Sequence, residues 1–255
     1  MNCRLCGGRT KKVLNQKILN KYIISYFLCE ECDLLQTEEP YWLEEAYSKP
    51  IDNSDTGLLV RNICLSIRSS IVFTFLYNHK GKFLDYAGGY GVLTRLMRDM
   101  GLDFYWNDPY ADNLFSIGFE MDQDGKYEAI TSFESFEHFV NPCDDFEKMI
   151  SKSKNVLITT TLRQECAVPD KDWWYYGKDH GQHVSFYSPK TLKFLADKYD
   201  LNIYTDGLYF SLFTKKKINR LTAKVLLNKL GIFLFPIVLL KNKSRTISDR
   251  ETLTE

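Results

Sequence analysis

One stretch decides the fold of this chain, Phe83-Leu-Asp-Tyr-Ala-Gly-Gly-Tyr-Gly91. Its apolar start is typical of a β-strand, which breaks into glycines before a segment with helical spacing at 92–100. Glycines at a strand end let the backbone approach a ligand closely, and the N-terminus of the next helix points to the same place. Because the acidic Asp85 precedes the glycines, a pyrophosphate is disfavoured there. The stretch therefore predicts a loop that holds a nucleotide-like ligand.

The glycine loop resembles the first motif of the class I S-adenosylmethionine-dependent methyltransferases, Asp/Glu-x-Gly-x-Gly-x-Gly. Asp85, Gly89 and Gly91 match this motif. Ala87 replaces its first glycine, and Gly88 is an additional glycine. The resemblance implies that these five residues bind S-adenosylmethionine, with a slightly altered turn at Ala87. An unoccupied strand-turn-helix is the alternative, since a lone glycine-rich loop is a weak signal.

Two later residues extend the expected cofactor site. Asp108 follows a strand predicted at 103–107, and ribose hydroxyls are usually accepted at this position. Phe133 ends a strand predicted at 127–133, and we assign it to the cofactor by its position alone.

From residue 81 onward, predicted strands and helices alternate, as in a parallel sheet that is covered on both faces. We expect strands at 82–86, 103–107, 127–133 and 155–161, a short strand near 118–121, and helices at 91–100, 111–116, 142–151 and 188–199. The segment 201–215 predicts a hairpin that turns at Asp206-Gly207. A doubly wound α/β sheet that is mostly parallel and ends in an antiparallel hairpin is the fold of the family that the chain resembles.

Composition sets the broad class. The chain has 255 residues, 44% hydrophobic and 15% aromatic, which favours a globular protein with a sizeable core. Lys plus Arg and Asp plus Glu are equal at 33 each, so nucleic acid is a disfavoured partner. We find no signal-like N-terminus and no apolar run of the ~18 to 20 residues that span a bilayer, and we therefore expect a cytoplasmic protein. The expected parts are a zinc ribbon at 1–40, a helical lead-in at 41–80, the methyltransferase-like domain at 81–217 and a basic, apolar helical segment at 218–255.

The N-terminal part carries a metal-binding pattern. Cys3-x2-Cys6 and Cys29-x2-Cys32 form two knuckles separated by 22 residues. Four thiolates at this spacing are typical of a closed tetrahedral Zn2+ site, which is structural because it has no open position for a substrate. A ribbon of this size buries little apolar surface, so the metal would supply much of its folding energy. Four reduced cysteines without a metal are the alternative.

The C-terminal segment is apolar in its middle and basic at its ends. Its apolar part covers 225–240 and is interrupted by Asn228, Lys229 and Pro236. One interpretation is a peripheral membrane contact with anionic lipid. The other is packing against the domain or a second subunit, and the sequence does not fix the number of subunits.

A candidate chemical site follows the strand at 127–133, where the chain reads Glu134-Ser-Phe-Glu137-His138. On one helical turn, residues at i, i+3 and i+4 point the same way, so these side chains should gather at the edge of the sheet where ligands bind. Such a group suits Mg2+, Mn2+ or Fe2+. The pattern also resembles the metal-binding motif of the small-RNA 2′-O-methyltransferases and of the ubiquinone-pathway O-methyltransferases. The alternative has no metal, with Glu137 orienting His138 as a lone base.

Three of the four histidines should meet at this edge, because His180 and His183 lie in the loop before the helix at 188–199. In the small-RNA enzymes a downstream histidine completes the metal shell, and the resemblance implies that His183 or His180 does so here. Alternatively, one of His138, His180 and His183 is the general base for methyl transfer, a task suited to a pKa of about 6.5.

Four consecutive aromatic residues precede these histidines: Trp173, Trp174, Tyr175 and Tyr176. Their ring faces can stack on sugars and on aromatic acceptors. We expect at least one or two of them to line the substrate pocket, with the others packed on the core.

These features together resemble bacterial methyltransferases that pair an N-terminal four-cysteine ribbon with this domain, several of which act on sugars or surface polysaccharide. The likeness covers most of residues 1–215. It implies an O-methyltransferase that acts on a saccharide hydroxyl of a polysaccharide or nucleotide-sugar. Alternative acceptors are a lipid-linked glycan, a quinone-like phenol and RNA. From another class, a non-catalytic cofactor-binding scaffold is the alternative, with Ala87 as the sign of decay.

Overall fold

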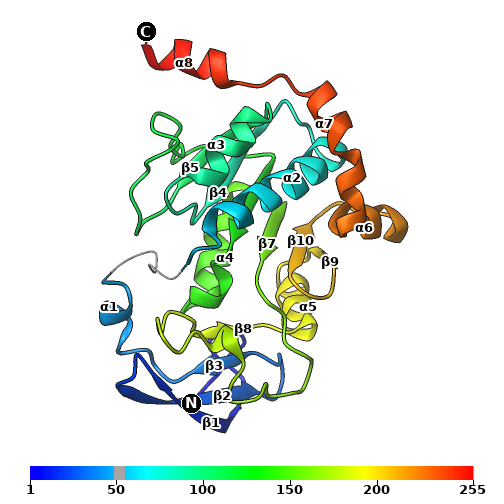
Figure 1. The fold of residues 1–255 in the computed structure, drawn as a ribbon. Helices are drawn as coiled ribbons and strands as arrows, with labels where there is room; N and C mark the ends of the chain where they lie inside the picture. The colour runs from blue at the N-terminus through cyan, green and yellow to red at the C-terminus, as the bar shows by residue number, and fades with distance from the viewer. Residues whose placement is uncertain (49–54, 255) are drawn as a thin grey trace.

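The computed structural model of the protein describes residues 1–48 and 55–254, and a six-stranded sheet forms its centre (Figure 1). In sheet order the strands are β5 (Asp103–Asn107), β4 (Lys82–Tyr86), β6 (Ala129–Phe133), β7 (Val156–Thr159), β10 (Phe210–Thr214) and β9 (Asn202–Thr205). The first four run parallel, whereas β10 is antiparallel to both of its neighbours. The expected mostly parallel sheet that ends in an antiparallel hairpin is therefore confirmed.

Burial on both faces explains why these segments form strands. Every residue of β7 and of β10 is buried, as in a sheet covered on two sides. The covering helices are α2 (Leu58–Leu76) and α3 (Val92–Asp99) on one face and α4 (Pro142–Lys152) and α5 (Pro189–Lys198) on the other. Neighbouring strand residues point to opposite faces, so Phe83 packs with α2 and α3 while Leu84 packs with α4 and α5.

A second, antiparallel sheet lies at the end of the molecule that carries the N-terminus (Figure 1). Its strands are β1 (Thr10–Ile18), β2 (Tyr22–Cys29), β3 (Leu35–Thr37) and β8 (Ser185–Phe186). The short helix α1 (Leu43–Ala46) follows β3. Because β8 comes from the segment between β7 and α5, the main domain completes the N-terminal sheet. The domain boundaries given above stay a prediction.

The C-terminal segment is helical. It forms α6 (Arg220–Leu227), the 3-10 helix η3 (Lys229–Leu234), α7 (Phe235–Lys241) and α8 (Thr246–Thr254). Leu226, Leu227 and Val238 join the apolar cluster that contains α2. By length and composition α2 could cross a membrane, and so could α6 with the segment Lys229–Lys241 if that bent pair is taken as one span. The expectation that no apolar segment is long enough to span a bilayer is therefore not confirmed. The middle of α2 is, however, buried in the core.

The helix expected at 111–116 is not formed. Asn113 Oδ1 accepts hydrogen bonds from the amide of Ser116 at 3.0 Å and from its hydroxyl at 2.8 Å. Such a local side-chain contact competes with helical backbone bonding. The short strand expected after it is reduced to a single bridge between Trp106 and Glu120.

Candidate active site and cysteine cluster

The glycine loop between β4 and α3 has a backbone that few residues tolerate. Ala87, Gly89 and Gly91 have φ angles of 58°, 54° and 83°, in the left-handed region. A Cβ atom on Gly91 would lie 2.4 Å from Ser116 Oγ and 2.7 Å from Asn113 Oδ1. The loop therefore needs glycine at position 91, while Ala87 adopts a conformation that is strained for alanine.

Two carboxylates flank this loop. Asp85 is 2% exposed and accepts hydrogen bonds from the hydroxyls of Thr131 at 2.8 Å and Thr94 at 3.2 Å. Burial raises the pKa of Asp85 to about 7. Asp108 stands after β5, and its Oδ2 accepts a hydrogen bond from the Gly89 amide at 2.9 Å. Asp108 therefore holds the loop directly, whereas Asp85 ties the strand before the loop to β6 and α3.

A second group of polar side chains follows β6 and includes the 3-10 helix η1 (Phe136–His138). Glu137, His138 and His183 each offer a ligand atom, and these atoms lie within 4.8 Å of one another. Glu137 is 1% exposed, and its Oε2 has no hydrogen-bond partner among the described residues. A buried carboxylate oxygen without a partner is costly, so it calls for a cation, a proton or a polar ligand.

The electrostatics of this group follow from burial. Burial, and then the charge of Glu134, raise the pKa of Glu137 to about 8. Burial, and then the charge of His180, lower the pKa of His138 to about 3. Burial and the neighbouring histidines also lower the pKa of His183 well below its usual value. Both imidazoles are therefore neutral at physiological pH, which is the form that binds metals and accepts protons.

Hydrogen bonds to the second ring nitrogen orient these histidines. The Tyr175 carbonyl lies 2.6 Å from His183 Nδ1, and since a carbonyl only accepts, Nδ1 carries the hydrogen. The lone pair of His183 is therefore on Nε2. His138 Nδ1 lies 2.9 Å from the Tyr47 hydroxyl, and the Tyr47 ring stacks on Tyr110 at a centroid distance of 5.9 Å.

The remaining residues of the predicted metal or base site lie beside this group. Glu134 has a φ of 50° and stands before the 3-10 turn, so it does not share one helical turn with Glu137 and His138 as the spacing predicted. Its Oε1 instead accepts a hydrogen bond from the Thr159 hydroxyl at 2.8 Å. His180 lies next to the group, with its ring centroid 4.7 Å from that of His183.

The aromatic run divides between core and surface. Tyr175 and Tyr176 are almost fully buried, and Trp173 packs with them in the apolar cluster beside the second sheet. Trp174 is 73% exposed and opens the short 3-10 helix η2 (Trp174–Tyr176). The ring of Tyr175 lies 4.7 Å from that of His183 and 5.2 Å from that of Trp174, so it connects the exposed indole to the histidines.

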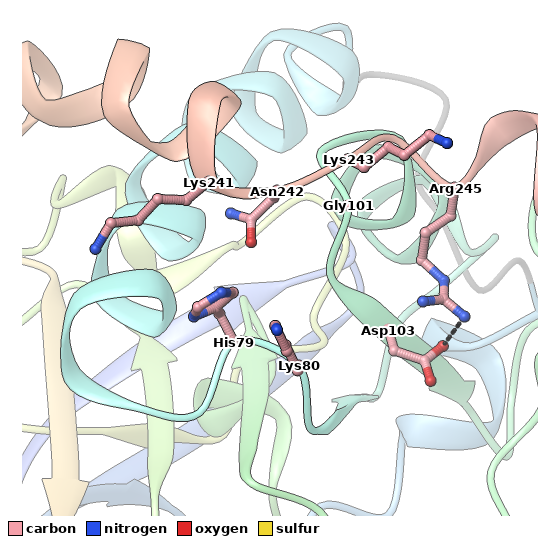
Figure 2. Close-up of a pocket in the computed structure, with 8 residues that line it drawn as sticks. All are labelled: His79, Lys80, Gly101, Asp103, Lys241, Asn242, Lys243 and Arg245. Atoms are coloured by element: carbon pink, nitrogen blue, oxygen red, sulfur yellow. Dashed lines mark ion pairs between the residues drawn. The ribbon is translucent and has the colours of Figure 1, made fainter.

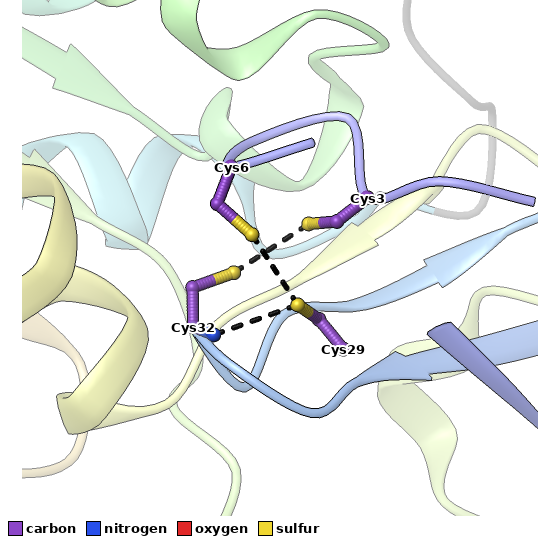
Figure 3. A group of neighbouring side chains, drawn as sticks. All are labelled: Cys3, Cys6, Cys29 and Cys32. Carbon is purple, nitrogen blue, oxygen red and sulfur yellow. Dashed lines mark hydrogen bonds between the residues drawn. The ribbon is translucent and has the colours of Figure 1, made fainter. Parts of the chain in front are cut away.

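The four cysteines of the two knuckles converge as a cluster (Figure 3). Cys3 Sγ lies 3.5 Å from Cys32 Sγ, and Cys6 Sγ lies 3.4 Å from Cys29 Sγ. Four thiolates at roughly 2.3 Å from a tetrahedral Zn2+ would be roughly 3.8 Å apart, so the arrangement needs little adjustment to hold the ion. Backbone amides also point at the sulfurs, as in the 3.4 Å contact from Gly8 to Cys6.

The comparison with protein families decides the identity. The family model described as "Methyltransferase domain" matches residues 64–206, which is more than half of the chain. The chain belongs to this methyltransferase family. With the fold and the glycine loop, this membership makes the protein an S-adenosylmethionine-dependent methyltransferase. No curated protein matches the methyltransferase in sequence.

Solved structures of methyltransferases are similar to part of this chain, at low sequence identity. The magnesium protoporphyrin IX methyltransferase (ChlM) from Synechocystis PCC 6803 with bound SAH is 11% identical, with 67% of this chain and 90% of that one covered and a TM-score of 0.42. The plantazolicin methyltransferase BpumL in complex with SAH is 13% identical, with coverages of 78% and 89% and a TM-score of 0.49. An O-methyltransferase family 2 protein from Planctomyces limnophilus DSM 3776 in complex with apigenin is 14% identical, with coverages of 68% and 65% and a TM-score of 0.43.

The loop of the methyltransferase fits S-adenosylmethionine. A Cβ atom on Gly88 would lie 2.7 Å from Asp85 Oδ2 and 3.0 Å from the Trp106 ring, so this position of the loop has no room for a side chain. A bare backbone beside the carboxylate of Asp108 is what a nucleoside with ribose hydroxyls requires. Phe133 is partly buried at the end of β6, where its ring lies 6.0 Å from that of Phe210.

The sequence did not reveal every residue that shapes the methyltransferase site. The role of Tyr47 beside His138 had no local signal, because the two residues are 91 positions apart. The Tyr175 carbonyl was missed as well, since a backbone group carries no residue type to recognise. Asn113 and Ser116 at the glycine loop were expected in a helix.

Proposed function

We propose that this methyltransferase transfers the methyl group of S-adenosylmethionine to a saccharide hydroxyl. The observation that carries the proposal is the unpartnered Oε2 of Glu137 beside the neutral imidazoles of His138 and His183. A hydroxyl acceptor supplies both a proton for these groups and an oxygen for the methyl group. These three residues follow β6 or lie beside it, and the glycine loop follows β4. Because β4 and β6 are parallel neighbours, the loop and the three residues lie at the same edge of the sheet.

The proposed reaction is an in-line displacement in which the residues mainly align and deprotonate. The acceptor oxygen forms the new bond to the methyl carbon, the carbon–sulfur bond breaks, and the sulfur keeps that electron pair. The hydroxyl proton goes to Nε2 of His183, whose Nδ1 is held by the Tyr175 carbonyl. An imidazole of low pKa suffices, because the oxygen becomes strongly acidic as the new bond forms.

We further propose a metal-bound form in which Glu137, His138 and His183 hold a divalent cation. In that form Nε2 of His183 is a ligand and not the base, and the proton of the bound hydroxyl leaves to solvent. Two imidazoles and one carboxylate suit Mn2+ or Fe2+ better than Mg2+, which prefers oxygen ligands. Such an ion would lower the pKa of a bound hydroxyl, most effectively for two adjacent hydroxyls on a sugar ring. Glu134 lies beside these ligands and would tune the charge of the group.

The exposed Trp174 supports an acceptor with a ring that can stack, such as a saccharide. Its indole is near the histidines through Tyr175, and an exposed ring face of this kind stacks on a sugar. The balance of acidic and basic residues supplies no general attraction for RNA. A lipid-linked glycan and a quinone-like phenol remain acceptors for the screen described below.

We also propose that Cys3, Cys6, Cys29 and Cys32 hold a structural Zn2+. Four thiolates are a closed donor set with no open position, so this ion would stabilise the ribbon and take no part in the reaction. Reduced cysteines are required for it, which favours a cytoplasmic location.

The test is a calorimetric titration of Mn2+ into the zinc-loaded protein saturated with S-adenosylhomocysteine. We expect one Mn2+ to bind, and Glu137→Gln or His183→Ala to abolish binding. Glu134→Gln and His79→Ala are the matched controls and should bind Mn2+, since neither side chain belongs to the ligand group. The same proteins are then incubated with tritiated S-adenosylmethionine and neutral saccharides, lipid-linked glycans, phenols or RNA.

The outcomes separate the parts of the proposal. Binding of S-adenosylhomocysteine without Mn2+ would overturn the metal site but leave His183 as the base. Transfer of label only to a phenol or to RNA would overturn the saccharide acceptor. If S-adenosylhomocysteine does not bind, the proposed methyl transfer is overturned.

A further inference from the structure

The C-terminal helices expose apolar side chains that the core does not use. On their inner side Leu226, Leu227 and Val238 pack into the cluster around α2. The exposed ones are Leu221, Val225, Leu230, Ile232, Phe233, Ile237, Leu239 and Leu240. We call these eight residues the C-terminal face. Helices α6 and α7 lie along one side of the domain, beyond α2 (Figure 1).

The exposure is large for single residues. Phe233 is 79% exposed and Leu240 is 87% exposed. Helices that are apolar on both the packed and the outer side are normally buried. A cluster of exposed apolar residues marks a surface that is covered by something else.

The charge of the same segment indicates what covers it. Residues 215–243 contain eight Lys or Arg and no Asp or Glu. Arg220, Lys224 and Lys229 lie within or between the helices of the face, and none of them forms an ion pair with another described residue. Apolar side chains next to uncompensated cations match an anionic lipid surface, in which acyl chains lie beneath phosphate groups.

A basic cavity adjoins the end of α7 (Figure 2). It has a volume of about 260 Å³, and its cations are Lys80, Lys241, Lys243 and Arg245. Its one carboxylate, Asp103, is already paired with Arg98 and Arg245. Lys241 directly follows the exposed Leu240, so the cavity borders the C-terminal face. It lies at the amino ends of β4 and β5, opposite the edge that carries the candidate active site.

We infer that the C-terminal face is a docking surface for an anionic lipid bilayer, and that the adjoining cavity binds lipid phosphate groups. A second copy of this chain is a poorer occupant, because a symmetric interface would place the same cations against one another. The face lies on the bilayer and does not cross it, since crossing would pull Leu226, Leu227 and Val238 out of the core. This inference does not depend on the acceptor of methyl transfer.

The test is co-sedimentation of the full chain with vesicles of phosphatidylcholine, with or without phosphatidylglycerol. We expect binding to be about tenfold or more tighter when phosphatidylglycerol is present. The double variant Phe233→Glu with Leu240→Glu should lose this binding. Its matched control replaces Ile23 and Leu208, which are 70% and 73% exposed outside the face, with Glu, and should bind like the wild type.

Two further measurements make each outcome decisive. Lys80→Gln with Lys243→Gln should weaken binding to anionic vesicles by about tenfold, and inorganic phosphate should compete only weakly with vesicles. S-adenosylhomocysteine binding checks that every variant is folded. Equal binding of wild type and the Phe233 and Leu240 variant would overturn the proposal. So would a wild-type dimer in solution that this variant converts to a monomer.

Discussion

Ala87 holds a backbone conformation that costs an L-residue about 1 to 2 kcal/mol. Its φ of 58° stands where the family motif has its first glycine, so the loop keeps the glycine geometry without the glycine. The loop therefore keeps its turn, with backbone strain at Ala87. An alanine at this position is no evidence that the cofactor loop has decayed.

This strain can be measured by replacing Ala87 with glycine. Ala87→Gly should leave the free energy of unfolding unchanged or raise it by up to about 1 kcal/mol, because relief of strain offsets the larger entropy of the unfolded chain. Ala223→Gly in α6 is the control and should lower the free energy of unfolding by about 1 kcal/mol. Urea unfolding measures both. A clear loss of stability in Ala87→Gly would contradict the strain.

At the residue scale, the sequence predicted which residues belong to the site better than it predicted their contacts. His138, His180 and His183 were expected at one edge because loops after parallel strands meet there, and their rings are in fact neighbours. The position of Glu134 could not be read in the same way. Its backbone turns at a φ of 50° to bond Thr159, a residue from the next strand that local spacing does not reveal.

At the element scale, long apolar patterns were reliable and short segments were not. The strands β4 and β5 occupy the predicted ranges, since apolar runs bounded by glycine or turn residues fix both ends. The strand β8 has two residues and exists only because β3 lies beside it. A strand this short has no periodicity from which it could be predicted. The segment 111–116 likewise depends on side chains that bond the backbone.

The helix α8 is attached to α3 by buried charges. Arg98 is 1% exposed, and its Nε and Nη2 each lie 2.7 Å from the carboxylate of Asp249. Arg95 adds a third contact at 2.8 Å. Burial alone would raise the pKa of Asp249, but the hydrogen bonds and charges of Arg98 and Arg95 outweigh it, and the pKa is lowered.

Removing this carboxylate should destabilise the protein. Asp249→Asn leaves Arg98 buried with less compensation, and we expect a loss of about 2 to 4 kcal/mol at pH 7 in urea unfolding. Because the folded pKa is depressed, the difference from wild type should be full above about pH 4 and shrink as the pH falls further. Glu251→Gln, an exposed change on α8, is the control. A difference that does not change with pH would contradict the ion pair.

At the scale of the whole molecule, hydrogen bonds join the N-terminal ribbon to the main domain. The Val184 carbonyl, next to His183, accepts hydrogen bonds from the amide of Thr37 at 3.0 Å and from the guanidinium of Arg4 at 2.6 Å. The amide of Val184 donates to the Glu137 carbonyl at 2.8 Å. One short segment therefore touches the ribbon on one side and the candidate active site on the other.

Loss of the Zn2+ that we propose for the cysteine cluster should therefore weaken the active site as well. Cys29→Ser should lower the zinc content, the melting temperature and methyl transfer, the last by about tenfold or more, because the support of His183 is lost. Cys64→Ser changes an exposed cysteine outside the cluster and should match the wild type. Zinc content, thermal unfolding and Mn2+ titration measure the effects. Full Mn2+ binding in a zinc-free Cys29→Ser protein would show that the two sites are independent.

The sharing of β8 also bears on how such a chain can evolve. A domain that is joined by a linker can be exchanged, duplicated or deleted by recombination without harm to its neighbour. Here the Val184 carbonyl would lose its donors from Thr37 and Arg4 if the first 40 residues were replaced by an unrelated module. Changes in the ribbon and in the histidine segment must therefore be inherited together, and a graft that carries only one of them should fail.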